Sequence, residues 1–225
     1  MSVRSGIGKG LPVMSGYSAE QRAAMQCMSL ARHGLPHALA DCGLPHVHLK
    51  IGEGIVTRRA LLISTVLGSC VSVTFFSRRL QLAGIFHAML PVITQSYRPC
   101  NEPCRFVDSA IEAVYGNFEK RGLHPEEVEV KLFGGAFSMG LREEHPDRCM
   151  IDVGGRNVLT AREVLAAKGL EIRSEQVQGT RGRKLLFNTR TGEVWVKLLN
   201  NAANQLARRQ EEQARAQSAR GCSLD

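Results

Sequence analysis

Cys70 and His87 are the two side chains whose types and positions indicate chemistry. Cys70 follows a run of small residues in "ISTVLGSCVSV" (63–73), and His87 opens "HAMLP" (87–91) seventeen positions later. An imidazole beside a thiol accepts its proton and stabilises the thiolate, which is the nucleophilic form of cysteine. Cys70 is therefore a candidate nucleophile with His87 as its base, and the alternative is a buried thiol of the core.

A hairpin would bring these two side chains together. We expect strands over 70–76 and 81–87 joined by a loop over 77–80, a register that sets Cys70 directly opposite His87. Directly opposed residues share a face of the sheet, with Cβ atoms ~4.5–5.5 Å apart. The other face of the hairpin is then apolar and carries Val71, Val73, Phe75, Leu82, Gly84 and Phe86.

A cysteine nucleophile that attacks a carbonyl needs donors for the oxyanion and a group that orients the histidine. Gly68 and Ser69 have small side chains, so their amides and that of Cys70 are candidate substrate-binding and oxyanion donors. Thr65 and its neighbour Ser64 carry the nearest hydroxyl groups for the orienting role. The sequence alone does not decide which amides bind the oxyanion or which hydroxyl group orients His87.

The composition is that of a globular protein. The chain has 225 residues, of which 44% are hydrophobic and 22% charged, which suits one domain with extensions. No apolar run approaches the ~18–20 residues that cross a bilayer, and the broken N-terminal sequence does not resemble a secretory signal. The seven cysteines lack the spacing of a disulfide framework, so we expect reduced thiols and a cytoplasmic protein without membrane insertion.

The chain carries a formal net charge of +8. A basic balance suits nucleic acid, an anionic membrane surface or an acidic protein partner. Lys and Arg are spread along the chain and aromatic residues make up only 5% of it. This distribution does not favour nucleic-acid binding, because such sites combine basic clusters with stacking aromatics.

We expect three regions: an N-terminal extension over 1–45, a catalytic domain over 46–200 and a polar C-terminal tail over 201–225. The extension includes one amphipathic helix within 18–34. In the domain, Asn157 is the expected N-cap of a helix, with a place in the substrate cleft as the alternative. The pattern predicts an α+β fold of layered mixed β-sheets with two main helices, from strands at 46–51, 73–76, 83–90 and 127–133, helices at 105–122 and 157–170, and a hairpin at 183–199 turning at 189–192.

Several ordered motifs resemble one known family. "TVLGSCV" (65–71) and "HAMLP" (87–91) are similar to the signature of the CheD chemoreceptor glutamine deamidases. The resemblance extends from about His48 to Leu198 and also includes "KLFGGA" (131–136), "VGGRNV" (153–158) and "GRKLLFNTRTGEVWVK" (182–197).

The resemblance implies a cytoplasmic enzyme that hydrolyses selected glutamine side chains of methyl-accepting chemotaxis receptors to glutamate, with release of ammonia. It implies that Cys70 is the nucleophile and His87 the base, and it places the family's threonine five or six residues before the cysteine, where Thr65 and Ser64 stand. The implied fold is similar to the catalytic domain of bacterial deamidating toxins and needs no metal or cofactor. Some members are regulated by a CheC-type phosphatase, which is a further candidate partner.

Three other interpretations remain open at this stage. The first is a non-catalytic basic adaptor that binds receptors, with Cys70 merely buried. The second is a cysteine esterase acting on receptor methyl esters. The third is a metal site built from Cys100 and Cys104 together with His46 and His48, whose spacings are near those of zinc ligands; we do not expect metal there, because the two pairs lie about fifty residues apart.

Overall fold

The computed structural model describes residues 43–93, 102–137, 152–199, 209–210 and 212–213. The chain divides into two compact units, Met1–His46 and Val47–Asp225, and the elements below belong to the second, apart from the first residue of β1. The helix expected within 18–34 and nearly all of the tail over 201–225 lie outside the described residues.

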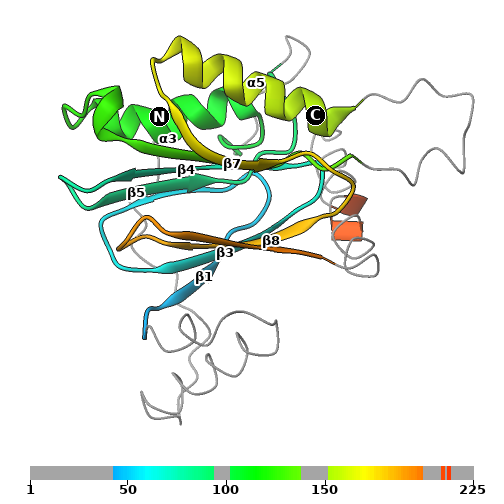
Figure 1. Cartoon of the computed structure of the whole chain (residues 1–225), viewed down its shortest axis with the longest axis horizontal. Coiled ribbons are helices and arrows are strands. Elements are labelled where there is room, and N and C mark those ends of the chain that lie inside the picture. The colour runs from blue at the N-terminus through cyan, green and yellow to red at the C-terminus, as the bar shows by residue number, and fades with distance from the viewer. Residues whose placement is uncertain (1–42, 94–101, 138–151, 200–208, 211, 214–225) are drawn as a thin grey trace, which may run out of the picture. The chain divides into compact units, whose positions relative to one another are not determined.

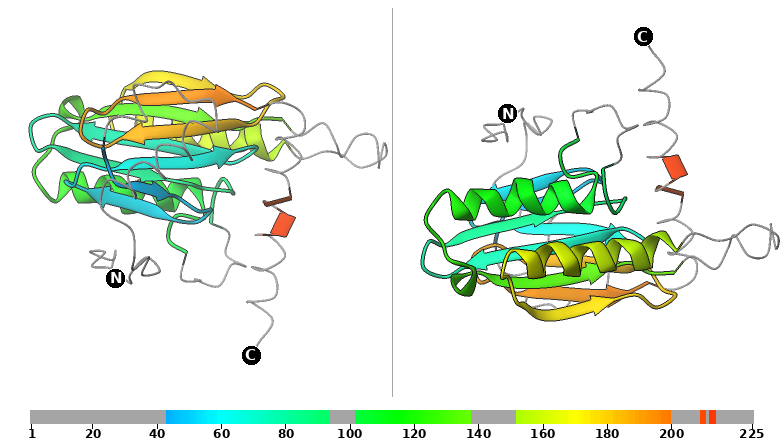
Figure 2. Two further views of the ribbon diagram at one scale, coloured as in Figure 1. Left: turned by 90° about the horizontal axis from the view of Figure 1, so that it is seen from below. Right: turned by 90° about the horizontal axis from the view of Figure 1, so that it is seen from above.

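Two β-sheets and two helices form three layers (Figure 1). Both helices cover the outer face of the five-stranded sheet, and the four-stranded sheet packs on its inner face (Figure 2). The four-stranded sheet has the order β1 (His46–His48), β3 (Leu62–Leu67), β8 (Arg183–Asn188) and β9 (Val194–Leu198). The five-stranded sheet has the order β2 (Gly54–Thr57), β5 (Leu82–Phe86), β4 (Val71–Ser77), β6 (Glu129–Gly134) and β7 (Ile172–Val177).

The predicted α+β class with layered mixed sheets and two main helices is confirmed. The helices are α3 (Val107–Glu119) and α5 (Val153–Ala167), and a short 3-10 helix covers Pro125–Glu127. In the five-stranded sheet β6 pairs with β7 in parallel, whereas β4 pairs with β5 and β6 in antiparallel fashion. The expected hairpin at 183–199 is also present, as β8 and β9.

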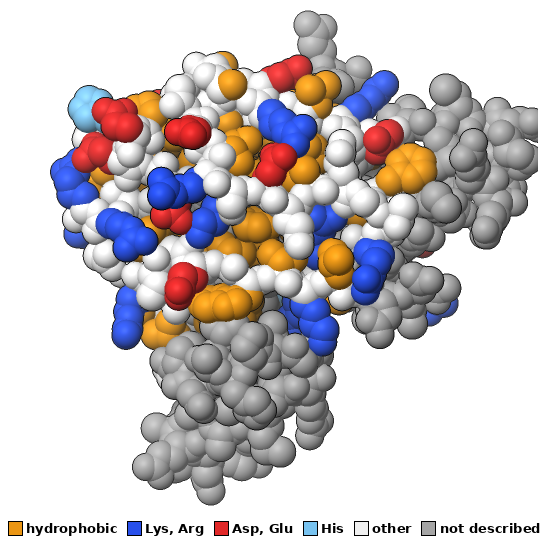
Figure 3. All heavy atoms as spheres, in the orientation of Figure 1, with side chains coloured by type: hydrophobic (Ala, Val, Ile, Leu, Met, Phe, Trp, Pro, Cys, Tyr) orange, Lys and Arg blue, Asp and Glu red, His pale blue; other side chains and the backbone are white. Residues whose placement is uncertain are grey.

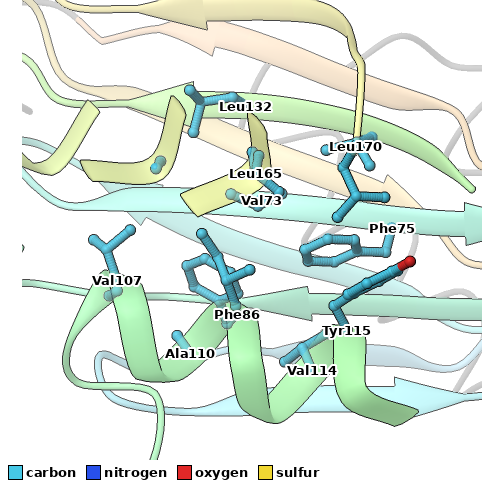
Figure 4. Close-up of a cluster of buried hydrophobic side chains, with 14 of the residues drawn as sticks. Val73, Phe75, Phe86, Val107, Ala110, Val114, Tyr115, Leu132, Leu165 and Leu170 are labelled. Carbon is cyan, nitrogen blue, oxygen red and sulfur yellow. The ribbon is translucent and has the colours of Figure 1, made fainter. Parts of the chain in front are cut away.

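Alternate residues of β4 enter two different hydrophobic cores. Val71, Val73 and Phe75 face the helices, where they pack with residues of α3 and α5 (Figure 4). Cys70 and Phe76 instead belong to the core between the two sheets. Because side chains alternate along a strand, burial of both faces explains why every residue of β4 is buried. The division of faces expected for the hairpin is confirmed.

The register of the hairpin differs from the predicted one by one residue on each strand. Ser77 pairs with Leu82 and Phe76 with Ala83, so the loop is Arg78–Gln81 rather than 77–80. Gln81 adopts a left-handed backbone conformation with φ of 47°, which suits a turn and cannot continue a strand. Pairing therefore begins one residue later than predicted. Each residue of β4 therefore pairs with a residue two positions further along β5 than predicted. Because side chains alternate with a period of two, each side chain keeps its face.

Helix α5 begins earlier than the sequence predicts. Its N-cap is Asp152, whose carboxylate accepts a hydrogen bond from the Gly155 amide at 2.8 Å. The expected N-cap, Asn157, lies inside the helix and is fully buried. The first turn of the helix holds the glycine pair at 154–155, because a helix N-terminus tolerates glycine where close packing requires it. The predicted cap was therefore wrong.

Strands β2 and β3 were not predicted, and neither was β7. The β7 sequence "IRSEQV" is exposed over four central residues, and an edge strand with polar side chains gives no alternating pattern.

The face drawn in Figure 3 carries acidic and basic side chains side by side rather than a block of one sign. Among the described residues, no helix is long and apolar enough to span a membrane.

Phe75 is the aromatic centre of the core beneath the helices. It is fully buried, and its ring lies 5.9–6.5 Å from those of Phe86, Tyr115 and Phe118. We predict that Phe75→Ala lowers the free energy of unfolding by about 3–5 kcal/mol, because it removes buried surface and leaves a cavity. Denaturant titration measures this, with the exposed Leu159 as control. A loss no larger than that of Leu159→Ala would contradict this packing.

Candidate active site

Cys70, His87 and Thr65 come from three neighbouring parts of the two sheets. Cys70 immediately precedes β4, His87 immediately follows β5, and Thr65 lies within β3 of the opposite sheet. Val71 and Ala88 form the last bridge between the two strands, with two backbone hydrogen bonds of 2.9 Å. Continued from this bridge, the register places Cys70 diagonal to His87 on the same face rather than directly opposite. Diagonal Cβ atoms lie somewhat under ~7–8 Å apart, which an imidazole ring can span.

The imidazole of His87 is held from across the sheet interface. Its Nδ1 lies 2.8 Å from Thr65 Oγ1, and the same hydroxyl donates a 2.9 Å hydrogen bond to the Leu49 carbonyl. The carbonyl only accepts, so the one hydroxyl proton is used there, and Nδ1 must donate to Oγ1. His87 is therefore the Nδ1–H tautomer. Its Nε2 is unprotonated, buried and without a hydrogen-bond partner among the described residues.

Burial keeps His87 neutral. Removal from water, followed by the nearby charge of His48, lowers the pKa of His87 from 6.5 to about 3. A hydrogen bond with the backbone of Leu49 opposes this shift. At neutral pH the site thus holds an uncharged imidazole with a free lone pair on Nε2, which is the state of a base rather than an acid.

Ser64 and Thr65 point to different histidines. Thr65 is on the inter-sheet face with the core residues Ile63 and Leu67, because β3 alternates. Ser64 points to the other face, where its hydroxyl lies 3.4 Å from His48 Nδ1. Of the two hydroxyl candidates, the structure brings only Thr65 to His87.

The glycine pair Gly134–Gly135 fixes the backbone at Cys70. Gly134 has φ of +109°, and a Cβ there would lie 2.1 Å from the Cys70 carbonyl oxygen. The Gly135 amide donates to that same oxygen at 2.8 Å, and the Ala136 amide donates to the Gly68 carbonyl at 2.8 Å. No side chain fits between these backbones, so glycine is required.

Helix α5 supports the Cys70 loop from the outer side. A Cβ on Gly154 would lie 2.8 Å from the carbonyl oxygens of Gly135 and Ala136, so the helix approaches the "FGGA" segment at backbone distance. Asn157, one turn further on, donates from Nδ2 to the Ser69 and Met89 carbonyls at 3.0 Å each. The two glycine-containing motifs therefore meet at the loop that carries Cys70.

Gly68 and Ser69, the predicted substrate-binding residues, lie in this supported loop. Their carbonyls are engaged by Ala136 and Asn157 respectively, which fixes the orientation of both peptide groups. The backbone that leads into Cys70, the candidate nucleophile, therefore has a defined conformation. Their role as oxyanion donors stays a prediction.

Arg183 is a residue of this region that the sequence patterns did not predict. It lies opposite Leu67 in the sheet, is 2% exposed, and its guanidinium donates to the carbonyls of Gln176 and Gln178. It thereby ties β8 of one sheet to the end of β7 in the other. An Arg–Lys pair at the start of a hairpin is typical of an exposed position. Only the tertiary structure shows that Arg183, the first of the two, is buried.

Of the four residues considered as zinc ligands, the structure describes His46, His48 and Cys104. Cys100 lies outside the described residues, and Cys104 is a buried thiol beside Gly54, with its pKa raised to about 12 by burial. No group of three or more His, Cys, Asp or Glu side chains suited to a metal occurs in the part of the chain that the structure describes.

The buried imidazole predicts a pH-dependent stability. In the unfolded chain a histidine titrates near 6.5, whereas the pKa of His87 in the folded protein is about 3. Between these values only the unfolded state binds the proton, so the free energy of unfolding falls as the pH drops from about 6.5 toward 3, by up to about 1.4 kcal/mol per pH unit. His87→Gln should show a shallower decline than the unaltered protein in denaturant titrations. Equal slopes for the two proteins would contradict a buried neutral His87.

Comparison with known proteins identifies relatives along most of the chain. Residues 89–198 match the family model described as CheD chemotactic sensory transduction. A "probable chemoreceptor glutamine deamidase CheD" of Nitratidesulfovibrio vulgaris is 52% identical over 166 residues, which cover 74% of this chain and 83% of that protein. Proteins of the same name from Geobacter sulfurreducens ("CheD 2") and Maridesulfovibrio salexigens are 47% and 41% identical, covering 70% and 68% of this chain and 92% and 91% of theirs.

The likeness to solved structures is much weaker. A crystal structure of a Neisseria meningitidis protein aligns over 78% of each chain with 14% identity and a TM-score of 0.35, which is too low to support a conclusion. The sequence relatives are decisive, because they match over more than two thirds of this chain and more than four fifths of their own length. The chain belongs to the CheD family.

Proposed function

We propose that the protein is a protein-glutamine deamidase that converts glutamine side chains of methyl-accepting chemotaxis receptors to glutamate. Two lines support this reading. The relatives described above are named chemoreceptor glutamine deamidases. The observation that carries the chemistry is the neutral His87 with a proton-free Nε2, oriented by Thr65 on the face that it shares with Cys70.

In the proposed reaction Cys70 attacks the side-chain amide carbon. His87 Nε2 takes the thiol proton, a bond forms between sulfur and carbon, and the amide oxygen becomes an oxyanion. The imidazolium then gives its proton to the amide nitrogen, the carbon–nitrogen bond breaks, and ammonia leaves. Water, activated by the same imidazole, hydrolyses the thioester to a glutamate carboxyl group and restores the thiol.

The low pKa of His87 fits this sequence of steps. An isolated buried imidazolium is unfavourable, so the resting site holds no charge on His87. When the thiol proton moves to Nε2, a thiolate forms at the same time, and its negative charge stabilises the imidazolium at short range. Proton transfer is therefore coupled to nucleophile formation. Because Cys70 and His87 are both buried, the substrate side chain must also gain access to the sulfur when it binds.

Replacement of Cys70 tests the nucleophile directly. We predict that Cys70→Ala abolishes deamidation of receptor cytoplasmic fragments, followed glutamine by glutamine by mass spectrometry together with ammonia release. Cys104→Ala is the matched control, because Cys104 is also a buried thiol but its pKa is raised to about 12. Unchanged conversion by Cys70→Ala would remove the proposed nucleophile.

A second prediction separates the two hydroxyl candidates. Thr65→Val keeps the shape of the side chain but removes the acceptor for His87 Nδ1–H, so we expect kcat to fall by about tenfold or more, within the range of general-base effects. Ser64→Ala, whose hydroxyl points to His48, should retain most activity. The opposite ranking in a steady-state deamidation assay would assign the orienting role to Ser64.

The same assays discriminate the alternatives. A cysteine esterase acting on receptor methyl esters would release methanol and leave glutamines unchanged. A non-catalytic adaptor would bind receptor fragments equally well with and without the Cys70 sulfur, and its thiol would resist alkylation until the protein unfolds. The orientation of His87 by Thr65 favours a catalytic site over the adaptor.

The prediction of a regulatory partner rests on the family resemblance alone, and the prediction of location rests also on cysteines that lack the spacing of a disulfide framework. We propose a cytoplasmic location, where receptor signalling domains lie, and a CheC-type phosphatase as a regulatory partner. We do not propose nucleic acid as a ligand, because Lys and Arg are spread along the chain and aromatic residues make up only 5% of it. Receptor deamidation with and without purified phosphatase would show whether such regulation occurs.

A further inference from the structure

Asn157 is a buried polar side chain that no part of the mechanism above uses. It lies in α5 with 0% exposure. Both of its amide protons are engaged, one by the Ser69 carbonyl and one by the Met89 carbonyl, each at 3.0 Å. Since carbonyl oxygens only accept, the nitrogen of the amide must face them, which fixes the orientation of the group.

The two acceptors stand beside the two reacting residues. Ser69 immediately precedes Cys70, and Met89 follows His87 by two positions. The ladder between β4 and β5 ends with the bridge from Val71 to Ala88. Beyond that bridge, a single side-chain amide spans the two segments and takes the place of the next pair of ladder hydrogen bonds.

This bond sets the direction of the Cys70 backbone. In a trans peptide the carbonyl and the following N–H point in opposite directions. With the Ser69 carbonyl held toward α5, the Cys70 N–H points away from the helix, and rotation of this peptide about its flanking bonds is blocked. The Cys70 side chain accordingly enters the core between the sheets, on the side from which Thr65 holds His87.

A purely packing role would not explain this residue. Its Oδ1 is buried and has no hydrogen-bond partner among the described residues, and an unsatisfied buried oxygen is unfavourable relative to an apolar side chain of the same size. The amide is therefore suited to joining two carbonyls, not to filling space. Its neighbours in the helix, Val158 and Ala161, fill the core with apolar atoms.

We propose that Asn157 is a positioning residue that holds the Cys70 loop against the His87 segment and so sets the alignment of thiol and imidazole. The inference rests on the proposed roles of Cys70 and His87. On this proposal Asn157 influences the reactivity of the Cys70 thiol but does not contact the substrate.

The experiment compares Asn157→Ala and Asn157→Asp with the unaltered full-length protein. Asp has nearly the same shape but presents an oxygen in place of the donating nitrogen. The readouts are the pH dependence of Cys70 alkylation by iodoacetamide, resolved by peptide mass spectrometry, and kcat and KM for a receptor cytoplasmic fragment. We expect both variants to lower kcat at least tenfold with little change in KM and to change the pH dependence of Cys70 alkylation.

Thr189→Val is the matched control for a general loss of stability. The Thr189 hydroxyl is buried, donates to the Arg59 carbonyl at 2.8 Å and accepts from the Leu61 amide at 2.7 Å, at the opposite end of β3 and β8. This variant should lower the melting temperature but leave the Cys70 alkylation profile unchanged.

Two results would overturn the assignment. One is an unshifted alkylation profile and unchanged kcat in a folded Asn157 variant. The other is failure of both Asn157 variants to fold while Thr189→Val folds, which would make Asn157 a residue of the fold as a whole. Failure of the proposed function is a separate outcome, in which Cys70→Ala still deamidates. Failure of the Asn157 assignment alone leaves Cys70→Ala inactive but both Asn157 variants unchanged in kcat and in Cys70 alkylation.

Discussion

The hydrogen bond between Thr65 and His87 is the interaction on which the site depends. It crosses from one sheet to the other, at 2.8 Å, in a part of the core where both residues are almost wholly excluded from water. The Leu49 carbonyl uses the only hydroxyl proton, and this decides which imidazole nitrogen carries hydrogen. A contact that packs two sheets together thereby also defines the protonation state of the proposed base.

Close backbone packing supplies the second constraint. Cys70 immediately precedes β4, at a point where the neighbouring segments approach so closely that Gly134, Gly135 and Gly154 have no space for a Cβ. Three layers therefore meet at one loop: the sheet that carries the cysteine, the helix that reaches it through Asn157, and the opposite sheet that holds the histidine. The fold itself thereby orders the backbone of the Cys70 loop and the ring of His87.

Much of this arrangement follows from local sequence patterns. The alternation in "VSVTFF" and "LAGIF" correctly separates the face of Cys70 and His87 from the face under the helices, since two-residue periodicity survives a shift of both strands. The exact register was beyond reach, because it depends on the left-handed conformation of Gln81. Glutamine is not among the residue types that favour turns, so the sequence does not indicate this conformation.

Long-range contacts account for the remaining differences. The choice between Ser64 and Thr65 depends on which face of β3 meets the other sheet, and no local pattern distinguishes two adjacent small hydroxyl residues. Asn157 has the residue type of a helix cap and was read as one, whereas Asp152 caps the helix. Its actual partners, Ser69 and Met89, are 88 and 68 positions away in the sequence.

The most direct test of the account is the protonation state of the two His87 ring nitrogens, measured by ¹⁵N NMR on the full-length protein. We predict a neutral ring near pH 7 with the proton on Nδ1 and none on Nε2, and no titration of this ring down to about pH 5, since burial lowers its pKa to about 3. A proton on Nε2, or an imidazolium near neutral pH, would contradict it.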